Sequence, residues 1–116
     1  MTNQVSSVLP QNLVALILES IYLKNVSTEA IDILKEMGAT EDVSTGENYW
    51  KMDFENDDVL LEKLIQLNKL GFLFVGEAAG WPPAEVFDYM KEKKSVSGKF
   101  KEIRWRGPGN WFIIER

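Results

Sequence analysis

Residues 11 to 23, QNLVALILESIYL, decide how the N-terminal half of this chain folds. Leu13 to Leu18 is the longest apolar run in the sequence, and three more apolar residues follow after Glu19 and Ser20. An apolar segment of this length, with hydrophobic side chains on nearly every side, is typical of a helix buried by its neighbours. A strand over residues 13 to 18 is the alternative. We expect the helix.

The next segment predicts a second helix, from about residue 28 to 37. Ser27 and Thr28 each offer a side-chain oxygen to the amides of a first helical turn, and Glu29 suits the positive end of the helix dipole. Gly38 is well placed to end this helix. The first two helices would then form an αα-hairpin, preceded by a loose tail over residues 1 to 9.

After a polar loop, strand and helix patterns alternate. Apolar and polar residues alternate from 49 to 54, as in a half-buried strand, whereas residues 72 to 75 are all apolar, as in an interior strand. The remaining expected elements are helices at about 57 to 70 and 83 to 94, and strands at 100 to 106 and 111 to 115 joined by a four-residue turn.

These elements predict an α+β fold in a single domain spanning residues 1 to 116. An N-terminal αα-hairpin would be followed by β-α-β-α-β-β, forming a mixed four-stranded sheet with helices packed on it. The strand at 72 to 75 should be central, and the last two strands should be antiparallel.

Composition is that of a globular domain and removes several kinds of chemistry. Of 116 residues, 45% are hydrophobic and 27% are charged, a balance that allows folding without cross-links. The absence of cysteine and histidine excludes thiolate zinc sites, cysteine nucleophiles and imidazole catalysis. No apolar run is long enough to span a bilayer and no signal peptide is evident, so a cytoplasmic location is expected.

Charge is distributed unevenly along the chain. The formal net charge is −5, but residues 1 to 90 carry 15 acidic and 5 basic side chains, whereas residues 91 to 116 carry 3 acidic and 8 basic ones. A strongly acidic surface can attract a basic partner and accelerate association. The alternative is that these charges only solvate the surface.

The loop GEAAGWPPAEV, residues 76 to 86, follows an apolar strand and precedes a helix, where many proteins bind phosphate. Its chemistry argues against phosphate, because Pro82 and Pro83 lack amide hydrogens and Glu77 adds negative charge. The two glycines of the loop would instead permit a tight turn, and Pro83 would start the helix. Trp81 would either pack against that helix or be offered to a partner as an anchor.

Residues 53 to 58 hold four carboxylates. A calcium loop of the EF-hand kind would require glycine where Asp58 stands and glutamate where Leu64 stands, so no metal is predicted there. Helix capping and solvation account for this cluster.

The basic C-terminal hairpin combines cations with aromatic residues, as in sheets that bind single-stranded nucleic acid. Strand alternation, however, places Lys101 and Trp105 on one face and Arg104 and Arg106 on the other, which divides the cations. Tryptophan and arginine beside the turn, including Trp111, are also the residue types enriched at interface hot spots. The alternative is that Trp105 and Trp111 pair across the strands and stiffen the hairpin.

We therefore expect a small acidic non-enzymatic protein-binding domain with no cofactor, of the inhibitor, immunity or antitoxin type, that occludes a basic partner such as a toxin or nuclease. The expected partner-binding residues comprise an acidic steering surface, one aromatic anchor and the hairpin tip: Glu41, Asp42, Glu47, Asp53, Glu55, Asp57, Asp58, Trp81, Arg104, Arg106 and Trp111.

Two alternatives come from other classes. One is a nucleic-acid-binding module that uses the basic hairpin, and the other is a homodimeric structural domain. An enzyme would have to rely on Glu77, Asp53 and Lys51, for which the sequence suggests no mechanism.

Overall fold

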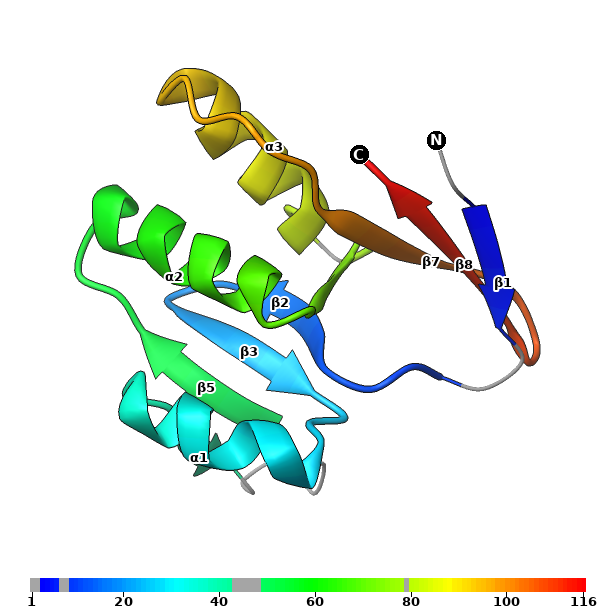
Figure 1. Ribbon diagram of the computed structural model, residues 1–116, viewed down its shortest axis with the longest axis horizontal. Coiled ribbons are helices and arrows are strands. Elements are labelled where there is room, and N and C mark those ends of the chain that lie inside the picture. The colour runs from blue at the N-terminus through cyan, green and yellow to red at the C-terminus, as the bar shows by residue number, and fades with distance from the viewer. Residues whose placement is uncertain (1–2, 7–8, 43–48, 79) are drawn as a thin grey trace.

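The computed structural model describes residues 3–6, 9–42, 49–78 and 80–116, and within these ranges it contains three helices and eight strands (Figure 1). The helices are α1 (Thr28–Glu36), α2 (Asp57–Lys69) and α3 (Pro83–Lys93). The strands are β1 (Asn3–Ser6), β2 (Leu13–Ile17), β3 (Ser20–Lys24), β4 (Thr40–Asp42), β5 (Tyr49–Asp53), β6 (Leu73–Val75), β7 (Lys101–Gly107) and β8 (Asn110–Glu115).

The described strands form one mixed sheet in the order β1-β8-β7-β6-β2-β3-β5-β4. Strand β6 pairs in parallel with β7 on one side and with β2 on the other, and the remaining neighbours are antiparallel. The central position of the predicted 72–75 strand and the antiparallel pairing of the last two strands are confirmed. The predicted four-stranded sheet is wrong, because β1, β2, β3 and β4 extend it.

The predicted αα-hairpin is also wrong, because residues 13 to 24 form a β-hairpin. Strands β2 and β3 pair from Leu13 opposite Lys24 to Ile17 opposite Ile21, with a register shift between Val14 and Leu16. The turn contains leucine and glutamate, so it lacks the glycine or asparagine that usually marks a hairpin in a sequence.

Burial on both faces explains why β2 has no two-residue period. Val14 is fully buried under the helices, while its neighbour Leu13, only 3% exposed, belongs to a second apolar cluster on the opposite face. A strand covered on both faces carries apolar side chains at successive positions. The same composition suits a buried helix, and length alone then favours the wrong structure.

Strands β1 and β4 arise in segments that were expected to be irregular. β1, in the expected tail, pairs antiparallel with β8, and β4, in the expected polar loop, pairs antiparallel with β5. Segments of three or four residues are too short to show a hydrophobic period. Their strand conformation depends on backbone hydrogen bonds to the neighbouring strands β8 and β5.

All three helices begin where the sequence predicts and end within one residue of the predicted end. Asn56 caps α2, since its Oδ1 accepts the Val59 amide at 2.9 Å, and Pro83 stands in the first turn of α3. The start of α1 differs from the expectation, because the Ser27 side chain makes no cap bond. Instead Asn12 Oδ1 accepts the Ser27 amide at 2.8 Å.

The helices cover one face of the sheet, and the main core lies between them and β2, β3, β5 and β6 (Figure 1). Its centre is a group of three buried rings: Phe74 of β6 lies 4.7 Å from Phe87 of α3 and 5.4 Å from Phe100, measured between ring centroids. On the opposite face the smaller cluster contains Leu13, Leu73, Ile103 and Ile113. No helix residue belongs to this cluster in the described part of the chain.

Asn12 joins the β-hairpin to α1, and its replacement should be costly. Its backbone is left-handed (φ 64°), and its side chain both accepts the Ser27 amide and donates to the Ser27 hydroxyl. Asn12→Ala should lower the free energy of unfolding by about 2–3 kcal/mol, because it loses these bonds and strains the backbone. Asn12→Gly loses only the bonds and should cost about 1 kcal/mol less. Urea unfolding of both variants measures the difference, and equal losses would contradict this role.

Candidate functional site

Three exposed hydrophobic side chains gather at one place on the helix-covered side. Leu18 is 60% exposed, Trp81 64% and Tyr89 51%, and all three line a hollow of about 270 Å³. The Trp81 and Tyr89 rings meet edge to face, with their centroids 5.7 Å apart. Asp57 also lines the hollow. We call Leu18, Asp57, Trp81 and Tyr89 the Trp81 surface.

Each residue of the Trp81 surface comes from a different element. Leu18 lies in the turn between β2 and β3, Asp57 is the first residue of α2, and Trp81 directly precedes Pro82, the N-cap of α3. Tyr89 faces outward because the buried residues of α3, among them Val86, Phe87 and Met90, lie on the other side of that helix. Trp81 is therefore displayed and not packed beneath its helix.

The acidic residues next to this surface differ in their contacts. Asp53 Oδ1 accepts a hydrogen bond from Ser20 Oγ at 2.5 Å, so this carboxylate braces the end of the β2–β3 hairpin. Asp58 forms a 2.9 Å ion pair with Lys94, whose pKa is raised first by the hydrogen bond to Asp58 and then by its charge. Glu55 and Asp57 are exposed. Asp57 lines the hollow and brings a negative charge to the Trp81 surface, and Glu55 stands two residues before it in the chain.

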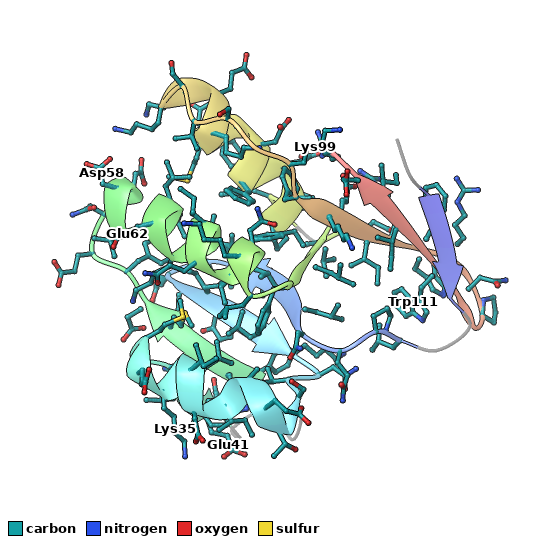
Figure 2. All side chains as sticks on the ribbon, viewed as in Figure 1. Lys35, Glu41, Asp58, Glu62, Lys99 and Trp111 are labelled. Atoms are coloured by element: carbon teal, nitrogen blue, oxygen red, sulfur yellow. The ribbon has the colours of Figure 1, made fainter. Side chains whose placement is uncertain are left out.

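The other predicted acidic residues lie elsewhere. Glu41 and Asp42 belong to β4, and Asp42 is paired with Tyr49 at the start of β5, whereas the acidic cluster follows the end of that strand. Asp42 and Glu41 are level with Tyr49 and Trp50, which lie about 13 Å and about 10 Å along β5 from Asp53. Figure 2 shows Glu41 well apart from Asp58. Glu47 lies outside the described residues.

A second cavity, of about 310 Å³, lies on the face of the sheet opposite the helices. Its floor is aliphatic, and its aromatic lining residues are Tyr49, Trp105 and Trp111, with Lys24 and Glu77 as the charged ones. Trp105 is 53% exposed and directly opposite the half-buried Trp111. We call this the sheet-face cavity. The predicted cross-strand pairing of the two tryptophans is confirmed.

The arginines of the hairpin lie on the other face, as strand alternation predicts. Arg106 stacks on Phe112, with its guanidinium carbon 4.0 Å from the ring centroid. Arg104 donates a hydrogen bond to the carboxylate of Glu102, which raises the pKa of Arg104. The hairpin turn is tighter than expected, since Gly107 pairs with Asn110 and only two residues lie between them.

Glu102 is a buried charge that we did not single out as a site residue. It is 2% exposed, and its Oε1 accepts a hydrogen bond from Arg116 Nη1 at 2.7 Å while its Oε2 accepts from Arg104. Burial of a carboxylate is tolerated here because two guanidinium groups compensate it. The burial of Glu102 could have been inferred from the alternation of side chains along the strand, which places it on the same face as the core residue Phe100.

Glycine is needed at position 76 because the Glu102 carboxylate lies against its backbone, and not because the chain turns there. A Cβ added to Gly76 would overlap Oε2 of Glu102, and the Gly76 amide donates to the Ile103 carbonyl at 2.9 Å. Gly80 does have the left-handed backbone of a tight turn (φ 100°). The expected turn-forming role is therefore confirmed for Gly80 and wrong for Gly76.

Among the described residues, no group of three or more Asp or Glu side chains is placed to hold a metal ion. No helix in the same ranges combines the length and hydrophobicity that a membrane span requires. Comparison of the chain with protein-family models, curated proteins and solved structures gives no match.

The overlap at Gly76 predicts a strong coupling between two positions. Gly76→Ala should lower the free energy of unfolding by about 2 kcal/mol, because the new methyl group displaces the Glu102 carboxylate from its arginine partners. In a Glu102→Ala background the same change should cost much less, since the carboxylate is gone and Arg104, whose Nε lies 2.9 Å from the added Cβ, is no longer held there by Glu102. Thermal or urea unfolding of the two single variants and the double variant measures the coupling. Simple additivity of the two losses would show that Gly76 serves another purpose.

Proposed function

We propose that this protein is a small non-enzymatic binding domain that docks a basic partner protein on the Trp81 surface, as an inhibitor of the immunity or antitoxin type does. The observation that carries the proposal is the convergence of three exposed hydrophobic side chains on one hollow, with a carboxylate at its edge. Scattered hydrophobic residues are ordinary on a protein surface, but a contiguous group marks an interaction site.

The chemistry of the surface favours a protein partner. Trp81 and Tyr89 offer large contact areas at a small entropic cost, and tryptophan and tyrosine dominate the energetics of protein interfaces. The edge contact between their rings restrains both side chains before binding. A partner therefore meets a partly preorganised anchor, which reduces the cost of association.

The charge of the surface favours a basic partner. Asp57 lines the hollow with the hydrophobic group, Glu55 is exposed two residues before it, and the chain as a whole carries a net charge of −5. Such a surface attracts a basic partner and repels an acidic one. The rival nucleic-acid function gains less support, because Arg104 and Arg106 lie on the face away from Trp105 and Trp111 and already contact Glu102 and Phe112.

Trp81→Ala should weaken the complex with a basic partner by about 2 kcal/mol or more, because it removes the central anchor. The partner can be isolated with the immobilised wild-type protein, with the product of a neighbouring gene as the first candidate, and then titrated by calorimetry. The fold of the variant should be unchanged, since Trp81 is 64% exposed. Equal affinity of wild type and variant would remove the Trp81 surface from the interface.

Two charge reversals distinguish the effect of a charge at the hollow from the effect of the net charge on association with the partner. Asp57→Lys and Glu62→Lys make the same change on exposed positions of α2, but only Asp57 lines the hollow. Asp57→Lys should slow association several-fold at low salt, and Glu62→Lys should have a much smaller effect. If sedimentation instead shows a wild-type dimer that Trp81→Ala dissociates, the surface joins two copies of this chain and the proposal is wrong.

A further inference from the structure

The sheet-face cavity has two chemically different ends, which follow from the strand register. Lys24 is opposite Leu13 of β2, and Leu13 is level with Leu73 of β6 and Lys101 of β7. Trp105 is four residues further along β7, about 13 Å in the strand direction, and β7 is three strands away from β3. Trp105 and Lys24 therefore occupy diagonally opposite corners of the cavity.

One corner combines two indole rings with a carboxylate. Trp105 and Trp111 are cross-strand partners, and Glu77 Oε1 accepts the Trp105 amide at 2.7 Å. All three residues line the cavity. The amide bond fixes the position of the carboxylate, and the remaining lone pairs of its two oxygens can accept further hydrogen bonds.

The other corner places a cation against an aromatic ring of this chain. Lys24 Nζ lies 5.8 Å from the centroid of the Tyr49 ring. The positive charge of Lys24 is thus held at the corner remote from Glu77. Arg104, the arginine next to Trp105 in sequence, forms its hydrogen bond with Glu102 on the opposite face, and its charge also attracts that of Glu77. Arg104 does not line the cavity, so the groups that the Trp105 corner presents to a ligand are a carboxylate and two electron-rich rings.

We infer that the corner formed by Glu77, Trp105 and Trp111 binds the side chain of an arginine. A guanidinium group stacks on indole faces and forms paired hydrogen bonds with a carboxylate, so it matches both components of the corner at once. The aliphatic floor, which includes Val75 and Ile103, suits the methylene stem of the same side chain.

The source of the arginine rests on the proposed function, which requires a basic partner. The loop between β6 and α3 connects the two sites, because Glu77 lines the sheet-face cavity and Trp81 lines the hollow of the Trp81 surface four positions later. Because the two sites lie on opposite sides of the sheet, a basic partner that occupies both must extend around this loop. The corner deepens the proposal by assigning a specific side chain to the partner.

Two small probes test the corner without the partner. N-acetyl-arginine methylamide carries the guanidinium group, and the corresponding citrulline compound has nearly the same shape without the charge. With isotope-labelled protein, the indole N–H signals of Trp105 and Trp111 should shift saturably with the arginine probe. The arginine probe should bind about five-fold or more tightly than the citrulline probe.

Glu77→Gln is the decisive variant, because glutamine can still accept the Trp105 amide but carries no charge. It should abolish the preference for arginine over citrulline, whereas Glu62→Gln, an equal change on α2, should leave it intact. Equal binding of the two probes by the wild type would overturn the inference. So would the absence of any shift at either indole, or tighter binding of a neutral nucleoside or methyl glucoside.

The two proposals fail in distinguishable ways. If Trp81→Ala weakens the partner complex but the arginine probe shows no preference, the partner surface stands and the arginine site is wrong. If the probe binds as expected and Trp81→Ala has no effect on any complex, the arginine site stands and the proposed docking surface is wrong.

Discussion

The parallel pairing of β2 with β6 is the contact on which the rest of the structure depends. It consists of two register pairs, Leu13 with Leu73 and Val14 with Phe74, and it joins the strands β3, β5 and β4 to β7, β8 and β1. The Asn12 carbonyl adds one bond by accepting the Leu73 amide at 3.0 Å. This short pairing is stabilised by buried side chains on both faces of the sheet. Val14 and Phe74 belong to the core under the helices, and Leu13 and Leu73 belong to the cluster on the opposite face.

This junction also positions both candidate sites. The β2 strand that passes through it ends in the turn that presents Leu18, and β6 leads directly into the loop that carries Glu77 and Trp81. The ring of Phe87 packs on Phe74 and thereby holds α3, which displays Tyr89, against the centre of the sheet. The proposed binding residues thus lie at the ends of well-packed elements. Rigid support of this kind lets exposed side chains keep a defined geometry.

Helices and strands that depend on local chemistry could be predicted from the sequence. Strands that depend on pairing with distant segments could not. The starts of α2 and α3 and the strands β5 to β8 follow from capping residues, prolines, glycines and periodicity, whereas α1 begins where predicted although Ser27 makes no cap bond. The β2–β3 hairpin was missed because a strand buried on two faces has the composition of a buried helix, and β1 and β4 because they are ordered only by their neighbours. For the sites, Trp81 was identified, but Leu18 and Tyr89 join it only through packing. The separation of Glu41 from Asp57 depends on strand order, which no local pattern reveals.

The acidic residues of β4 illustrate a different use of charge. Strand β4 stands at the end of the sheet, so one side of its backbone has no neighbouring strand among the described residues. It is only three residues long, and it carries the exposed Glu41 and the half-buried Asp42. A second molecule that added its own strand there would bring like charges together along a very short ladder. Like charges on so short an edge strand therefore disfavour edge-to-edge extension of the sheet.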